Sequence, residues 1–252
     1  MKIAGKVALV TGASGVIGGA IAERLASEGA KVIGTYTGSE EEGRRTKDKI
    51  IKSGGEMHLA ELDQRSPPTI DAFAESIAAN HGRLDIMVNN AAWNVGIPFT
   101  DLDSLTPELW DRVLETNLRG PFLLARACAV LLKADGGGHI VNISSIGGIT
   151  PIGSSMAYSA GKAGLNHLTR CLAVALAPEV AVNCVAPGLV ENTGMSNRAM
   201  DPRTQTAARE GTLLGCAANV TDIAEQVLTL VSSRSITGQL IAIDGGVPGA
   251  MH

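Results

Sequence analysis

The sequence predicts an α/β fold, in which a doubly wound and mostly parallel sheet carries helices on both faces. Short runs of apolar and β-branched residues alternate with longer segments of helical pattern. Because no linker rich in Pro, Gly or Ser interrupts this alternation, we expect residues 1–252 to form one domain. A chain of 252 residues is long enough to bury the core of such a domain.

The expected elements are bounded by glycine, proline or a change of periodicity. The run at 84–89 is almost wholly apolar, which is typical of a strand at the centre of a parallel sheet. Residues 186–215 break the alternation and are expected to be rich in loops. The expected strands are 7–11, 31–36, 57–62, 84–89, 139–144, 180–185 and 239–243, and the expected helices are 17–28, 39–53, 67–81, 109–132, 155–177 and 220–232.

Composition argues against several classes of function. A net charge of −4 does not suit a general binder of nucleic acid or of anionic membranes. The basic residues of 44–52 lie among acidic ones, which indicates a solvated helix face. We find neither a secretory signal nor an apolar run of the roughly 20 residues that span a bilayer. These observations favour a cytoplasmic protein with no nucleic-acid or membrane partner.

Cysteine and histidine point to no metal and no disulfide. The five histidines show no ligand-like clustering. The four cysteines form no C-x-x-C motif, and we expect them to be small buried residues in a reducing compartment. They are Cys128, Cys171, Cys184 and Cys216.

The segment TGASGVIG at 11–18 follows the first expected strand and opens the first expected helix. In this context glycines allow the backbone to approach a pyrophosphate, and the N–H groups of the helix N-terminus bind it. The sequence therefore predicts a dinucleotide site. A tight turn without a ligand is the alternative.

The end of the second strand distinguishes the two nicotinamide dinucleotides. An acidic residue there would bind the ribose of NAD and repel the 2′-phosphate of NADP. Here Tyr36 and Thr37 occupy that place, and no carboxylate appears before Glu40. NADP(H) is therefore favoured over NAD(H), although the glycine turn lacks an arginine. Leu62 and Asp63, which end the third strand, are candidates to bracket the adenine, unless Asp63 is an ordinary strand-end residue.

Tyr158 and Lys162 are separated by one helical turn, so their side chains share a face. An ammonium beside a phenol is expected to lower the pKa of the phenol from about 10 toward working pH. Such a tyrosine can transfer a proton at a carbonyl or alcohol. A hydroxyl from Ser145 would stabilise negative charge on the reacting oxygen. An isolated pair of this kind would more simply be a tyrosine beside a solvated lysine.

Taken together, these motifs resemble the short-chain dehydrogenases/reductases, in their single-domain branch of about this length. The resemblance runs from Lys6 to Gly246 and is nearest to the members similar to 3-oxoacyl-carrier-protein reductases. It implies a Rossmann-type domain with a seven-stranded sheet. The landmarks that carry it, in family order, are TGASGVIG, Leu62-Asp63, Asn89-Asn90-Ala91-Ala92, Thr116-Asn117, Ile143-Ser144-Ser145, Tyr158-x-x-x-Lys162, Asn183-Cys184-Val185-Ala186-Pro187-Gly188 and Ile236-Thr237-Gly238…Asp244-Gly245-Gly246.

The resemblance implies roles for individual residues. Tyr158 would be the general acid/base, Lys162 its activator and a ligand of the nicotinamide ribose, and Ser145 the group that polarises the substrate oxygen. Asn117 would hold a water in a proton relay. The residues expected to contact the cofactor are Gly12, Ser14, Gly15, Ile17, Gly18, Thr37, Leu62, Asp63, Asn90, Ala91, Tyr158, Lys162, Pro187, Gly188, Val190 and Thr193.

The chain departs from the family pattern in its glycine turn. Its spacing of Gly12, Gly15 and Gly18 is closer to the longer branch of the family that modifies sugar nucleotides, and position 16 is Val. This shift removes the arginine that commonly binds the NADP phosphate in the family, so the phosphate contacts do not follow from the resemblance. Ala92 stands where the family usually has glycine, which is a milder change.

The substrate side is expected to be an apolar pocket for a small-molecule ketone or secondary alcohol. Trp93, Ile152, Ser145 and Tyr158 are its candidate residues, and the loop at about 189–215 would act as a lid. The resemblance also implies a homotetramer, with contacts between the helices expected at 109–132 and 155–177. Both carry apolar residues on more than one face.

Two other functions compete with a general carbonyl reductase/alcohol dehydrogenase. A 3-oxoacyl-[acyl-carrier-protein] reductase of fatty acid synthesis would need a basic surface for its acidic partner. Lys133 stands alone in its segment, and residues 178–182 carry no basic side chain. A non-catalytic cofactor-binding sensor or scaffold would usually lose the Tyr or Lys, and this chain keeps both. A serine hydrolase is disfavoured because no G-x-S-x-G motif is present.

Overall fold

The computed structural model describes residues 1–191 and 193–250 and contains one sheet of seven parallel strands. The strand order is β3-β2-β1-β4-β5-β6-β7, so the direction of winding reverses between β1 and β4. This confirms the expected Rossmann-type architecture, with the apolar strand β4 at the centre. The strands are β1 (Val7–Val10), β2 (Lys31–Tyr36), β3 (Glu56–Glu61), β4 (Ile86–Asn89), β5 (Gly138–Ile143), β6 (Val180–Pro187) and β7 (Leu240–Ile243).

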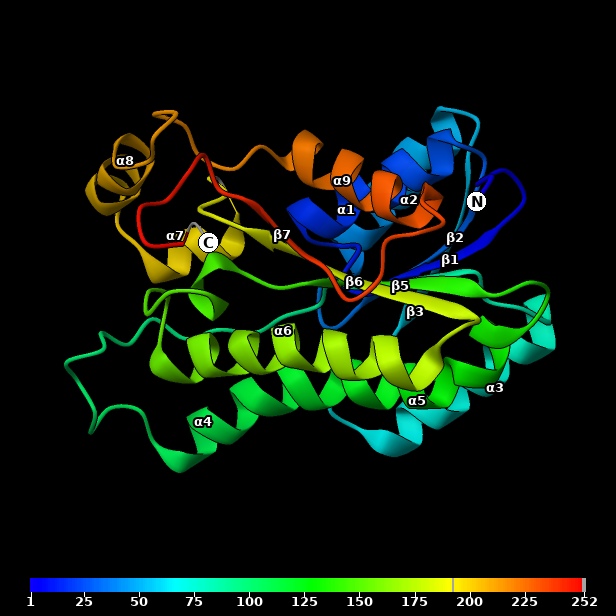
Figure 1. The fold of residues 1–252 in the computed structure, drawn as a ribbon, viewed down its shortest axis with the longest axis horizontal. Helices are drawn as coiled ribbons and strands as arrows, with labels where there is room; N and C mark the ends of the chain where they lie inside the picture. The colour runs from blue at the N-terminus through cyan, green and yellow to red at the C-terminus, as the bar shows by residue number, and fades with distance from the viewer. Residues whose placement is uncertain (192, 251–252) are drawn as a thin grey trace.

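Helices cover both faces of the sheet (Figure 1). One layer contains α1 (Val16–Ser27), α2 (Glu40–Lys52) and α9 (Val220–Ser232), and the other contains α3 (Pro67–His81), α5 (Gly120–Lys133) and α6 (Met156–Leu176). The expected mixed charge of α2 appears as surface ion pairs one turn apart, such as Arg44 with Glu40. No helix in the described residues is both long and apolar enough to cross a membrane.

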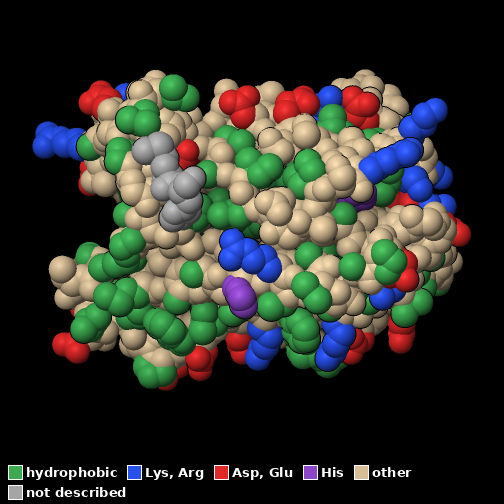
Figure 2. Space-filling model, viewed as in Figure 1, with side chains coloured by type: hydrophobic (Ala, Val, Ile, Leu, Met, Phe, Trp, Pro, Cys, Tyr) green, Lys and Arg blue, Asp and Glu red, His purple; other side chains and the backbone are tan. Residues whose placement is uncertain are grey.

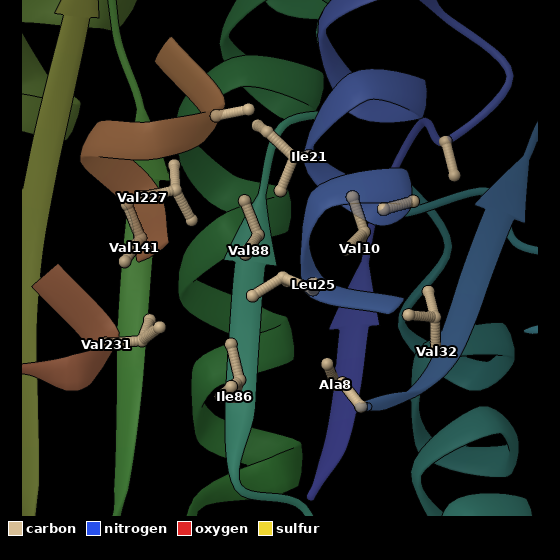
Figure 3. Packing of buried hydrophobic residues seen from close by; sticks show 14 of the residues in the cluster. Ala8, Val10, Ile21, Leu25, Val32, Ile86, Val88, Val141, Val227 and Val231 are labelled. Atoms are coloured by element: carbon tan, nitrogen blue, oxygen red, sulfur yellow. The ribbon is translucent and has the colours of Figure 1, made fainter. Parts of the chain in front are cut away.

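Two apolar cores lie on the two faces of the sheet, because successive residues of a strand point to opposite sides. On one face, Ile21 and Leu25 of α1 and Val227 of α9 pack over Val10 and Val88 (Figure 3). Each Val, Leu or Ile buried in this way contributes about 1.5–3 kcal/mol. The carboxyl ends of the central strands are thereby held as a rigid edge.

The helix expected at 109–132 is interrupted by a turn of π-helix. It consists of α4 (Pro107–Leu114), a π-helical segment η1 (Glu115–Arg119) and α5. Pro121 has no N–H to donate to the carbonyl four residues earlier, whereas Gly120 N donates to Glu115 O in the wider π pattern. The interruption places Asn117 in the middle of the π turn.

The segment 186–215 is more regular than expected, since it contains α7 (Gly194–Ala199) and α8 (Pro202–Glu210). Thr193 and Ser196 form a capping box at the start of α7, and Asp201 caps α8 ahead of Pro202. These caps are local sequence signals for helix starts. Asn192 lies outside the described residues.

The expectation for cysteines is right for two of the four. Cys128 and Cys184 are buried, but Cys171 and Cys216 are exposed. Cys171 lies on the outer side of α6, and Cys216 lies in the loop after α8. In the described part of the chain, no group of three or more His, Cys, Asp or Glu is placed to hold a metal ion.

Candidate functional site

A cleft of about 940 Å³ lies at the carboxyl ends of the strands, around the point where the winding reverses. It runs from the glycine turn past the ends of β2 and β3 to the residues that follow β4, β5 and β6. Figure 2 shows a notch in the left edge of the molecule, below α7 and α8 and above the loop that precedes α4. Met195 and Met200 line the cleft from the α7 side.

Eighteen of the residues expected at the site line this cleft, and two do not. The two exceptions are Asn117 and Leu62. The lining residues are Gly12, Ser14, Gly15, Ile17, Gly18, Thr37, Asp63, Asn90, Ala91, Trp93, Ser145, Ile152, Tyr158, Lys162, Pro187, Gly188, Val190 and Thr193.

The glycine turn is held by contacts that exclude larger residues at two positions. Gly12 has a φ of 66°, in the left-handed region. A Cβ on Gly18 would stand 2.3 Å from Gly12 O and 2.5 Å from Asn90 Nδ2. Asn90 explains this crowding, because its Nδ2 donates to Thr11 O at 2.9 Å and to Gly12 O at 3.2 Å. Asn90 therefore ties the end of β4 to the turn.

Gly15 differs from its neighbours, since it is exposed in the cleft and open to a ligand. It is the N-cap of α1, and no side chain occupies the helix end. A Cβ added there would meet only Gly12 O, at 3.4 Å. The helix N-terminus without a side-chain cap, the close backbone turn and the long cleft fit a dinucleotide whose pyrophosphate lies against α1.

At the far end of the cleft, Leu62 is placed differently from its expected role. Its side chain is 3% exposed and belongs to a core cluster, because Leu62 directly follows a strand whose inner face it continues. Its carbonyl oxygen accepts a hydrogen bond of 2.6 Å from Thr37 Oγ1, which joins the ends of β2 and β3. Asp63 does reach the cleft, where Arg65 pairs with it at 2.7 Å.

Tyr158 and Lys162 lie in the first two turns of α6, and both are buried. Ser155 caps this helix by accepting a hydrogen bond of 3.2 Å from Tyr158 N. Lys162 Nζ donates to Ile143 O at 2.8 Å and lies 5.7 Å from the centre of the Tyr158 ring. Ser145 directly follows Ser144 at the end of β5, and its hydroxyl accepts a hydrogen bond of 3.1 Å from Gly147 N. The three side chains thus meet at the cleft wall.

The expected acidification of Tyr158 by Lys162 is wrong for this structure. Burial raises the pKa of Tyr158 to about 12, and the Ser145 hydroxyl opposes this only in part. Burial also lowers the pKa of Lys162 to about 8, although the nearby Cys184 thiol acts in the other direction. Because desolvation is the largest influence on this pKa, Tyr158 is a protonated phenol at neutral pH.

Asn117 lies behind the cleft wall and is 1% exposed. Its Nδ2 donates to Trp93 O at 2.7 Å, and its Oδ1 accepts from Trp93 N at 2.9 Å. The π turn therefore fixes the backbone at Trp93. This is a second position, besides Asn90, where a side-chain amide organises the loop after β4.

Pro187, Gly188, Val190 and Thr193 line the cleft after β6. Gly188 packs closely, because a Cβ there would lie 2.9 Å from Asp244 Cα. The Thr193 hydroxyl accepts a hydrogen bond of 2.9 Å from Ser196 N in the cap of α7. If the Thr193 hydroxyl also bound a phosphate, it would do so while it takes part in the capping box.

On the substrate side, Trp93 and Ile152 both line the cleft, as do Ile146 and Gly147. Trp93 also has a partner that sequence reasoning missed, since the Arg112 guanidinium carbon lies 4.1 Å from the centre of its ring. Gln64 and Arg65 are further lining residues that were missed. No spacing signals them, because they meet the cleft only through the packing of separate loops.

Known proteins are similar to this chain over nearly its whole length. A family model described as "Enoyl-(Acyl carrier protein) reductase" matches residues 12–248. The "3-oxoacyl-[acyl-carrier-protein] reductase FabG" of Escherichia coli (strain K12) is 37% identical, over 98% of this chain and 99% of that protein. The "3beta-hydroxysteroid dehydrogenase 1" of Eggerthella lenta is 33% identical, over 96% of this chain and 94% of the relative.

Solved structures agree with this similarity. The crystal structure of a single-residue variant of "Actinorhodin Polyketide Ketoreductase with NADPH" superposes with a TM-score of 0.85 and 33% sequence identity. The match covers 96% of this chain and 97% of that one.

Proposed function

We propose, on the premise that this chain belongs to the short-chain dehydrogenase/reductase family, that it reduces a ketone to a secondary alcohol with a nicotinamide cofactor. The observation that carries this proposal is the meeting of Ser145, Tyr158 and Lys162 in the cleft that begins at the glycine turn. The bound nicotinamide would supply the hydride that the carbonyl carbon accepts.

The side chains of the chain itself handle the proton and the developing charge. Tyr158, protonated at neutral pH, donates its phenolic proton to the carbonyl oxygen as negative charge grows there. Ser145 donates a second hydrogen bond to the same oxygen. Two donors at one oxygen suit a C=O group better than the C=C group of an enoyl substrate. Lys162, held by Ile143 O, keeps a positive charge near the phenol below about pH 8.

The remaining residues hold the reactants. We assign Asn90 and Ala91 to the cofactor ribose, Val190 and Thr193 to the carboxamide and phosphate, and Asn117 to the relay that resupplies Tyr158. The side chain of Asn117 contacts the backbone of Trp93 rather than the open cleft. A proton relay from Asn117 to Tyr158 would therefore also need groups that lie between them. The segment 189–215, with its two short helices, would close over the substrate as a lid.

NADP(H) is the preferred cofactor in this proposal. β2 ends in Tyr36 and Thr37 and so carries no carboxylate at the strand end itself, although Glu42 of α2 also lines the cleft. The polyketide ketoreductase that superposes on this chain was crystallised with NADPH. Initial rates with NADPH and NADH at equal concentration test the preference. A higher kcat/KM with NADH would contradict it.

A second candidate is reduction of a 3-oxoacyl group carried by an acyl carrier protein, because relatives with that name are 37% identical over nearly the whole chain. The exposed Arg112 at the cleft offers a cation for an acidic partner. Lys133, by contrast, is already paired with Glu179 at 3.6 Å.

Consumption of NADPH measured by absorbance, with a panel of ketones and with acetoacetyl thioesters, separates the candidates. Turnover of free ketones supports the general carbonyl reductase, and strong preference for the carrier-bound thioester supports the second candidate. Binding of NADPH without turnover of any compound would contradict both and favour a sensor.

We also propose that the chain assembles as a homotetramer through α5 and α6. Both helices expose apolar side chains that a lone chain would leave in water, with Val130 on α5 and Val174 on α6 each 82% exposed.

A further inference from the structure

Asn94 carries an unpaired polar side chain at the substrate end of the cleft. It is 4% exposed and lines the cavity, and its Oδ1 has no hydrogen-bond partner among the described residues. Buried polar atoms in folded proteins are nearly always paired, and leaving one unpaired costs stability. The Asn94 carboxamide is therefore placed where a group on a ligand can complete it.

Ser154 offers a second such group from a neighbouring loop. Its Oγ is also buried and, within the described part of the chain, without a partner, and it lines the same cavity. Ile97 N donates to Ser154 O at 2.8 Å, which joins the loop after β4 to the loop before α6. The two unpaired groups are thus held by loops that are fastened together.

Both groups lie next to the reacting residues. Trp93 and Val95, on either side of Asn94, pack against the cluster that contains Tyr158. Ser155, the residue after Ser154, caps the helix that carries Tyr158. A ligand group bound by Asn94 and Ser154 would therefore belong to the molecule whose carbonyl faces Tyr158.

We propose that Asn94 and Ser154 form a polar subsite that binds a hydroxyl on the carbon skeleton of the ketone, so that the preferred substrates are hydroxy-ketones. The proposal rests on the ketone reduction proposed above. A hydroxyl both donates and accepts, so it satisfies a carboxamide in either orientation and can also bond the Ser154 hydroxyl. Ile146, Ile152 and Met195 line the same cleft and suit the apolar part of the skeleton.

The test compares cyclohexanone with its 2-, 3- and 4-hydroxy derivatives under saturating NADPH. The parent enzyme is expected to favour at least one hydroxy-ketone by about tenfold or more in kcat/KM, because a site built to bond a hydroxyl rejects the analogue that lacks it. Asn94→Leu, of similar size, is expected to reduce this ratio to about one while cyclohexanone changes by less than about threefold. Asn94→Asp retains an acceptor and should retain part of the preference.

The matched control is Asn80→Leu, an exposed asparagine on α3, which should leave the ratio unchanged. Equal kcat/KM for all four ketones with the parent enzyme, or an equal loss for all four with Asn94→Leu, would overturn the subsite and leave the ketone reductase intact.

Binding to the Tyr158→Phe holoenzyme gives a readout independent of turnover. Tighter binding of a hydroxycyclohexanone than of cyclohexanone, abolished by adding Asn94→Leu, supports the subsite even if the parent consumes NADPH with none of the four. That outcome would uphold the subsite, and the wider panel of ketones and thioesters would decide the proposed activity. Absence of both turnover and selective binding overturns the subsite.

Discussion

Lys162 carries a charge that changes within the working range of pH. Burial lowers its pKa to about 8, whereas burial raises the pKa of Tyr158 to about 12. The lysine is cationic below about pH 8 and neutral above it, while the phenol stays protonated throughout. We therefore expect kcat/KM for ketone reduction to be flat near neutrality and to fall as pH rises through about 8. Lys162→Met should be slower, and its pH profile should lack this inflection. If the inflection near pH 8 persists in Lys162→Met, another group causes it.

Tyr158 provides the second prediction at the scale of single residues. Tyr158→Phe removes the proton donor but keeps the ring, so kcat should fall by about 10²–10⁴ while the dissociation constant for NADPH changes by less than about threefold. Stopped-flow turnover and a fluorescence titration measure the two quantities. The chain has one other tyrosine, Tyr36, and Tyr36→Phe should retain kcat at saturating NADPH. Near-parental turnover of Tyr158→Phe would remove the phenol from the mechanism.

At the scale of elements, the turn between β1 and α1 separates a structural glycine from a binding glycine. Gly18→Ala would press a methyl group onto Gly12 O and Asn90, and should cost about 1–3 kcal/mol in the free energy of unfolding. Gly15→Ala meets only an ordinary contact at 3.4 Å, so stability should change by about 0.5 kcal/mol or less. Its methyl group enters the cleft, however, and should weaken NADPH binding. Urea unfolding and NADPH titration of both variants check this contrast, which equal stability of the two would contradict.

The sequence predicts most elements because each strand is an apolar run between clear boundaries. The regular alternation of strand and helix then favours one topology, a parallel sheet with right-handed crossover connections. It does not predict the π turn at Glu115–Arg119, because helical periodicity continues through it and only Pro121 hints at the break. The short helix α7 depends on the cap formed by Thr193, a signal of only a few residues.

In the candidate site, too, some features follow from the sequence and others depend on packing. Tyr158, Lys162 and Ser145 follow from their spacing, since one helical turn sets two of them on one face. The pKa of Tyr158 does not follow, because it depends on how completely the surrounding loops cover the phenol. The stacking of Arg112 on Trp93 and the unpaired carboxamide of Asn94 likewise arise from packing between segments distant in sequence.

At the scale of the whole molecule, the distribution of exposed apolar side chains predicts an assembly. Phe122 on α5 is 42% exposed, and Val130 and Val174 are each 82% exposed. Burying such side chains between copies contributes about 25 cal/mol for each Å² of apolar surface removed from water.

Light scattering should therefore give a mass of about four times the 25.9 kDa of one chain. Glutamate at both positions, Val130→Glu with Val174→Glu, would place charge in the contact and should shift the protein to smaller species at the same concentration. Ile51→Glu is the matched control, because Ile51 is 50% exposed on α2 in the opposite layer and should leave the mass unchanged. A parent of single-chain mass, or a double variant of unchanged mass, would exclude α5 and α6 as the interface.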